Sequence, residues 1–116
     1  NIQISSYVYN NYFITNNGWS NFTSRREGNT GRFINPSDYD SRTNTLYAAH
    51  EPGKYLYIKN VGTNNSIGVK DVAEMDGVIS AITVSPNEEN RVFLATSRGE
   101  LLRVDNTVSF CTPMLF

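Results

Sequence analysis

Two stretches of the sequence repeat one pattern of an apolar strand, a turn glycine and a second apolar strand: Leu46–Leu56 (LYAAHEPGKYL) and Val92–Leu102 (VFLATSRGELL). Gly99 follows Gly53 by 46 residues, and the apolar residues around both glycines keep the same offset. Aromatic and β-branched residues favour pleated strands, and glycine permits the positive φ of a tight turn. Each stretch therefore predicts a β-hairpin, and the two hairpins are predicted to be copies of one unit.

The predicted unit is longer than the hairpin, because a proline segment precedes both copies. Asn35-Pro36-Ser37 stands before the first and Ser85-Pro86-Asn87 before the second. A period of this length is typical of one four-stranded blade of a β-propeller, and such blades bury their faces only against neighbours. We therefore predict an all-β chain that forms part of a β-propeller, with about two to three four-stranded blades. Residues 1–22 would end one blade, 23–68 would form a complete blade, and 69–116 would form a further, truncated blade.

The N-terminal segment also has a strand-like pattern. Ile2–Tyr9 alternates in polarity, and Tyr12–Thr15 follows it as a second short strand. Asparagine tolerates the positive φ of two-residue hairpin turns. The hairpin is therefore expected to turn at Asn10-Asn11.

Two segments between the repeated hairpins complete the expected strands. Val78–Val84 alternates, which would place Ile79, Ala81 and Thr83 together on one face. Val69–Met75 is short and ends at a glycine, so we interpret it as a loop or outer strand, with a helical turn as the alternative.

The composition excludes several classes of protein. Of the 116 residues, 39% are hydrophobic and 18% are charged, with a net charge of -1. Such a chain can fold, and it lacks the clustered basic face that nucleic-acid binding requires. No apolar run is long enough to insert into a membrane, and Cys111, the only cysteine, has no partner for an internal disulfide. The chain begins without Met and ends on apolar residues, so we expect a fragment of a longer protein.

A family resemblance follows from the second copy of the repeat. Val78–Asn87, Arg91–Thr96 and Gly99–Asp105, taken in order, resemble the blades of Asp-box (BNR) propellers. That family includes sialidases, the sortilin ectodomain, xyloglucanase-type glycosidases and bacterial surface proteins. Its blades end in the Asp box, Ser/Thr-x-Asp-x-Gly-x-x-Trp/Phe, on the turn after the third strand.

Thr15–Phe22 resembles a degenerate Asp box. Thr15 takes the first place, Asn17 the Asp place and Phe22 the closing aromatic place, while Trp19 stands where the family has glycine. The resemblance implies that Asn17 holds its own turn through hydrogen bonds to backbone amides and that Phe22 packs beneath the turn.

Arg103–Phe110 resembles a second degenerate box. It keeps Asp105 as the turn-holding residue and Phe110 as the packing aromatic, but it lacks the Ser and the Gly. The blade between them would carry its box at Tyr57–Asn64, where only Asn60 fits the pattern.

The segment Phe33–Asp40, with its asparagine-rich surroundings, resembles large exported propeller proteins of Bacteroidetes. In those proteins a sorting domain for type IX secretion often follows the propellers. The resemblance implies a secreted or bacterial cell-surface location.

The sequence offers few candidates for chemistry. Asp38, Asp40 and Glu27 are candidate paired carboxylates, as a glycoside hydrolase requires. Asp38 and Asp40 would share a face in a strand, but we interpret their segment as an ordinary loop. His50 is the lone histidine, and because a metal site needs several ligands we expect it at a turn or core edge. Trp19 is a candidate residue of a glycan- or protein-binding surface.

Together these observations predict a non-catalytic propeller segment that acts as a scaffold and a protein- or glycan-binding module, with no cofactor and no metal. Its expected partners are the remaining blades of the same propeller and a protein or carbohydrate ligand, without nucleic acid or membrane insertion. One alternative is part of a propeller glycoside hydrolase, xyloglucanase- or sialidase-like, whose acids lie mostly outside this segment. Another is a sortilin-like sorting or secretion component.

Overall fold

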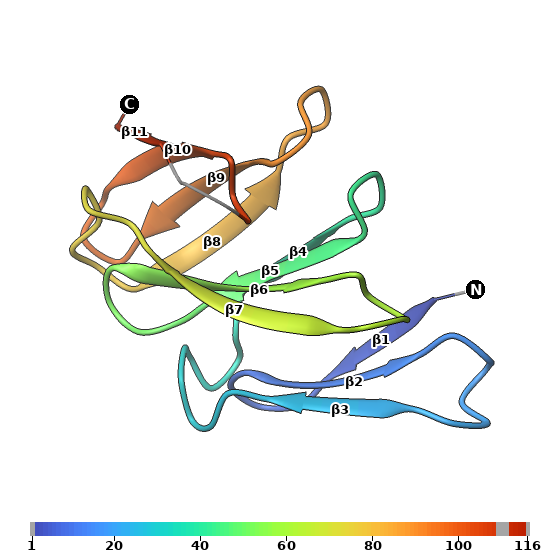
Figure 1. The fold of residues 1–116 in the computed structure, drawn as a ribbon. Helices are drawn as coiled ribbons and strands as arrows, with labels where there is room; N and C mark the ends of the chain where they lie inside the picture. The colour runs from blue at the N-terminus through green and yellow to red at the C-terminus, as the bar shows by residue number, and fades with distance from the viewer. Residues whose placement is uncertain (1, 109–111, 116) are drawn as a thin grey trace.

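The computed structural model describes residues 2–108 and 112–115, and these fold into three antiparallel sheets. In each sheet the strands pair in chain order, so every sheet is a meander (Figure 1). Sheet 1 contains β1 (Gln3–Ser6), β2 (Asn11–Thr15) and β3 (Thr23–Arg26). Sheet 2 contains β4 (Ser37–Asp40), β5 (Thr45–Ala49), β6 (Lys54–Lys59) and β7 (Ser66–Asp71). Sheet 3 contains β8 (Ile79–Val84), β9 (Arg91–Thr96), β10 (Leu101–Asp105) and β11 (Thr112–Leu115).

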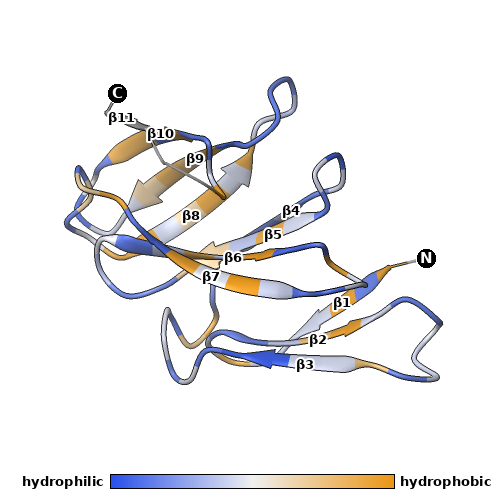
Figure 2. Cartoon of the chain, viewed as in Figure 1, coloured by the Kyte–Doolittle hydropathy of each residue, from blue (hydrophilic) through white to orange (hydrophobic). Residues whose placement is uncertain are grey.

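The expected all-β class is confirmed, and sheet 2 lies between the other two sheets (Figure 1). Apolar residues concentrate on the strands, whereas the hairpin loops are mostly hydrophilic (Figure 2). In the described part of the chain, no helix is long and apolar enough to cross a membrane.

Two apolar cores join the three sheets, one on each face of sheet 2. β5 is buried along its whole length, because alternate side chains enter alternate cores. The core between sheets 1 and 2 contains Tyr12, Ile14, Leu46, Ala48, Leu56, Ile58 and Val61. The core between sheets 2 and 3 contains Tyr47, Ala49, Tyr55, Val72, Met75, Ile79, Ile82, Val92, Leu94, Leu102 and Val104.

The 46-residue repeat of the sequence extends to strand register. β5 and β6 pair Leu46 with Ile58, and β9 and β10 pair Val92 with Val104, each 46 residues later. Positive φ recurs with the same offset at three pairs of residues: Asn44 and Asn90, Gly53 and Gly99, and Asn60 and Asn106. The two predicted hairpins are therefore confirmed as equivalent units.

The predicted turn at Asn10-Asn11 is wrong. Tyr9 takes the positive φ of 60°, and Asn11 already belongs to β2. Asn10 is fully buried, where its Nδ2 donates to the carbonyl oxygen of Ala49 at 2.7 Å and its Oδ1 accepts from the Tyr12 hydroxyl at 2.9 Å. A buried amide needs such partners, so this side chain connects two sheets and is not free to form the turn.

The segment before β9 departs from strict alternation. A β-bulge between Ile79 and Ala81 shifts the register, so Ile79 and Ile82 are both buried while Ala81 is exposed. A bulge adds one residue to a strand, which reverses the faces beyond it. The expected grouping of Ile79 with Ala81 is therefore wrong. Of the segment Val69–Met75, expected as a loop or outer strand, only Val69–Asp71 lies in a strand, as the end of β7, and a turn closed by Met75 N–H to Val72 O, at 3.1 Å, follows it.

Three strands were not expected from the sequence: β3, β4 and β11. The interpretation of Asp38 and Asp40 as loop residues is wrong, because β4 pairs with β5 and sets Tyr39 opposite Leu46. β3 pairs with β2, so sheet 1 continues past Phe22.

Candidate functional site

The carboxylates of Asp38 and Asp40 project from β4 toward sheet 3. Asp38 Oδ2 accepts a hydrogen bond from the backbone N–H of Val84 at 2.8 Å. Asp40 is buried, and its Oδ1 lies 3.2 Å from Nε of Arg42. The two carboxylates share a face, as alternate strand residues must, but each is bound by a protein group.

Arg42 links Asp40 to sheet 3. Its guanidinium donates hydrogen bonds to carbonyl oxygens of the turn between β8 and β9, those of Ser85, Pro86 and Glu88. Burial acts to raise the pKa of Asp40, but the hydrogen bonds and charge of Arg42 outweigh it and hold that pKa below its ordinary value. Asp40 therefore stays ionised at neutral pH, which suits a structural ion pair and not a proton donor.

His50 lies at the edge of the core, between sheets 1 and 2, and is only 5% exposed. Its Nε2 is 3.8 Å from Oε1 of Glu27, and neither ring nitrogen has a hydrogen-bond partner among the described residues. Glu27 thus lies beside His50 and does not extend the pair of carboxylates on β4. Within the described residues, no three His, Cys, Asp or Glu side chains group as metal ligands.

The loop between β2 and β3 is held by its own polar residues. The buried hydroxyl of Thr15 accepts hydrogen bonds from the backbone N–H groups of Asn17 (3.3 Å) and Trp19 (3.2 Å). Asn17 Oδ1 accepts one from the N–H of Asn21 at 3.0 Å. Trp19 consequently sits at a φ of 71°, a region that bulky residues rarely adopt.

The other residues of the two box-like stretches have different surroundings. Phe22 is 59% exposed, and its ring meets that of Phe13 edge-on at 5.9 Å and lies 6.4 Å from that of Trp19 in the turn. Asp105 Oδ1 lies 2.6 Å from Nε of Arg91, in an ion pair between β9 and β10. Phe110 lies outside the described residues.

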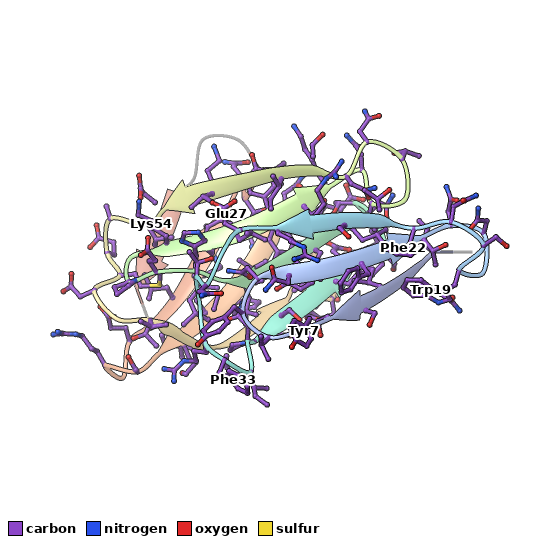
Figure 3. The ribbon with its side chains drawn as sticks, turned by 90° about the horizontal axis from the view of Figure 1, so that it is seen from below. Tyr7, Trp19, Phe22, Glu27, Phe33 and Lys54 are labelled. Carbon is purple, nitrogen blue, oxygen red and sulfur yellow. The ribbon has the colours of Figure 1, made fainter. Side chains whose placement is uncertain are left out.

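Two surface hollows contain exposed aromatic side chains. The first, the aromatic hollow, is about 390 Å3 in volume and is lined by Ser5, Phe13, Trp19 and Phe22 on sheet 1. Trp19 and Phe22 lie together at one end of the molecule, away from Tyr7 and Phe33 (Figure 3).

The second, the loop hollow, is about 270 Å3 in volume and joins the β1–β2 loop to the connection between β3 and β4. Its lining residues are Ser6, Tyr7, Val8, Phe33, Ile34 and Asn35. Ile34 is 83% exposed, and both Tyr7 and Phe33 are largely exposed as well.

No protein-family model, curated protein or solved structure matches this chain.

Sequence reasoning had singled out Trp19, Asp38, Asp40 and His50, and the structure does not bring these four together into one site. It missed the exposed Ile34, although this residue precedes an Asn-Pro step that disfavours regular pairing. Ile34 is an aliphatic residue outside every strand expected from the sequence, and this was the signal that could have identified the loop hollow.

Proposed function

We propose that this chain is a non-catalytic segment of a β-propeller that acts as a scaffold and presents a protein-binding surface at the loop hollow. The observation that carries the proposal is the stacking of consecutive meander sheets with a 46-residue repeat in register. Propellers are built by such radial repetition of four-stranded sheets, and the further blades of the same propeller would cover the outer faces of sheets 1 and 3.

The scaffold role is supported by the engagement of the candidate acids. A glycoside hydrolase needs one carboxyl group to donate a proton and a second to act as base or nucleophile across a sugar. Asp38 instead accepts a backbone hydrogen bond from β8, and Asp40 is ion-paired with Arg42. Both carboxylates stabilise the junction of sheets 2 and 3.

The binding role is supported by the loop hollow. It lies on loops at the ends of the strands, where a neighbouring sheet would not cover it, and contiguous exposed apolar surface marks interaction sites. Aromatic residues are enriched in protein interfaces, whereas a glycan site requires free polar groups to fix hydroxyls. The side-chain amide of Asn35 is already bound to Asn10 and Ala49, so an apolar protein segment fits this surface better than a sugar.

Selection of ligands from a displayed peptide library tests the proposal, with a glycan array screened in parallel. Selected peptides should lose at least about tenfold in affinity on Ile34→Ser, because central apolar anchors dominate interface energy. Ile67→Ser on β7 is the matched control, since Ile67 is also apolar and exposed but lies outside the hollow. Binding to glycans that Ile34→Ser abolishes, or hydrolysis of a glycan that Asp38→Ala abolishes, would overturn it.

A further inference from the structure

A small polar hollow lies between sheets 1 and 2, at the opposite end of β2 from the loop hollow. It is about 100 Å3 in volume and is formed by the loop between β2 and β3 together with the turn between β6 and β7. Phe22, labelled at this end of the molecule in Figure 3, contributes to its lining. We call it the amide hollow, because its polar lining consists of the side chains of Asn16, Asn21 and Asn65 with those of Thr15, Thr23 and Thr63.

The walls of the amide hollow are fixed by hydrogen bonds between sheet 1 and sheet 2. Asn16 Nδ2 donates to the carbonyl oxygen of Gly62 at 2.7 Å. Arg25 Nε donates to the carbonyl oxygen of Asn65 at 2.8 Å. The hollow is therefore formed before any ligand binds. Both of its walls belong to described sheets, so further blades on the outer faces of sheets 1 and 3 would not cover it.

Polar groups in the amide hollow remain free to bind a ligand. The side chain of Asn21 is exposed, and this residue holds its turn through backbone groups: its N–H donates to Asn17, and its carbonyl oxygen accepts from Thr15. Within the part of the chain that the structure describes, neither the Asn21 amide nor the Thr23 hydroxyl has a hydrogen-bond partner. Both side chains can therefore donate to a ligand and accept from it.

The lining determines which ligand chemistry fits. None of the described residues that line the hollow is charged, so a charged ligand would lose hydration without gaining an ion pair from them. An apolar ligand would leave the amides unpaired, which costs free energy. Sugar hydroxyls donate and accept hydrogen bonds, as amides do, while Phe22 offers an apolar surface to the ring carbons. A neutral sugar satisfies all three conditions.

We propose that the amide hollow binds one neutral hexose unit of a glycan, with Asn21 and Thr23 fixing its hydroxyls. The hollow is shallow and admits part of one sugar ring, so few ligand atoms are bound and the dissociation constant should be about 1 mM. The site is separate from the loop hollow. It therefore goes beyond the protein-binding role proposed above and does not depend on it.

Titration of the isotope-labelled chain with glucose, galactose, mannose or N-acetylglucosamine, followed by nuclear magnetic resonance, tests the proposal. At least one of these sugars should give saturable shifts of backbone amides within residues 15–23 and 62–65, with a dissociation constant of about 1 mM. The absence of saturable shifts up to about 100 mM of every sugar would refute the site, as would shifts centred on the loop hollow.

Two variants and a matched control test the residues assigned to binding. Asn21→Ala removes the free amide, and Thr23→Val removes the hydroxyl with little change of shape. Each should weaken binding about three- to tenfold, as expected for a lost hydrogen bond. Asn87→Ala is the control, because Asn87 is also an exposed asparagine but lies between β8 and β9. Circular dichroism checks that all three variants fold, and an affinity equal to that of the wild type in all three would overturn the assignment.

A charged sugar and the peptides selected on the loop hollow separate this site from the alternatives. Glucuronate should bind more weakly than the best of the four neutral sugars. Tighter binding of glucuronate would assign the ligand to Arg25, which contacts the β6–β7 turn, and would contradict the proposal. Selected peptides should keep their affinity on Asn21→Ala. Peptides that lose affinity on Asn21→Ala but keep it on Ile34→Ser would place a protein ligand in the amide hollow, and the sugar site would then be wrong.

Discussion

Replacing Gly53 or Gly99 by alanine should give unequal losses of stability, although the two glycines are equivalent in the repeat. Their φ values are +78° and +79°, so the added Cβ meets the same backbone strain in both hairpins. The surroundings differ. A Cβ on Gly99 would meet nothing within 4 Å, whereas one on Gly53 would lie 3.1 Å from the carbonyl oxygen of Met75.

The magnitude follows from these two contributions. The left-handed conformation costs an L-residue about 1–2 kcal/mol. Alanine also lowers the conformational entropy of the unfolded chain, which offsets part of that cost. Gly99→Ala should therefore lower the free energy of unfolding by about 1 kcal/mol. Gly53→Ala should cost about 2–3 kcal/mol, because the hairpin cannot move away freely. The N–H of Gly53 bonds Gly77 O at 3.3 Å, and its carbonyl oxygen accepts from Val72 N at 2.8 Å.

Urea unfolding followed by far-ultraviolet circular dichroism measures both values. The two variants should keep the slope of the transition and differ only in its midpoint. Equal losses of stability in the two variants would refute the contact between a Cβ at position 53 and the β7–β8 connection. No loss in Gly99→Ala would refute the positive φ, and with it the equivalence of the two hairpins.

Three further predictions concern polar residues. Asp40→Asn should destabilise the chain by about 1–3 kcal/mol in thermal unfolding, because the guanidinium of Arg42 loses its charged partner. A loss of stability below about a few tenths of a kcal/mol would show that the ion pair contributes nothing. Glu100 accepts hydrogen bonds from Gly77 N–H and Thr96 Oγ1, and these lower its pKa. Its contribution to stability is therefore present above about pH 4.3, the pKa of glutamate in the unfolded chain. This contribution is lost as the pH falls through the lower pKa of the folded state. Unfolding measured from pH 7 to 2 should show the stability gap between wild type and Glu100→Gln closing in acid, and a constant gap would contradict this. Thr15→Val should cost about 1–3 kcal/mol by leaving turn amides unbound, and unchanged stability would count against the hydroxyl as the holder of that turn.

The repeated hairpins could be predicted because their signals are local. Strand-favouring residues flank a glycine in each copy, and the agreement of two copies reinforces both. β3 and β4 could not be found in this way. Their sequences, Thr23–Arg26 and Ser37–Asp40, are polar, and their pairing depends on groups distant in the chain. Arg25 of β3, for example, donates to Asn65 O at 2.8 Å.

The candidate site was predictable only in part, for a related reason. Asn17 and Thr15 could be assigned to a turn because such side chains bond backbone groups within a few residues. The burial of His50 depends on sheet 1, whose packing no local pattern reveals. The exposure of Ile34 is equally a property of the assembled fold.

The places where the repeat fails are as informative as those where it holds. Positions that shape a sheet are kept, as Asn44 and Asn90 show, whereas the residues that join sheets 2 and 3 by polar contacts are not. Val84 pairs with Val92 as Tyr39 pairs with Leu46, so Ser85 takes the place of Asp40 in the next copy, and the turn that follows, residues 86–90, contains no arginine. Sheet 3 therefore lacks the arginine with which sheet 2 binds the carbonyl oxygens of its neighbour, while its outer face stays apolar. Apolar burial is non-directional, so it lets any two such sheets stack, and the unrepeated ion pair is what makes sheet 3 the specific neighbour of sheet 2.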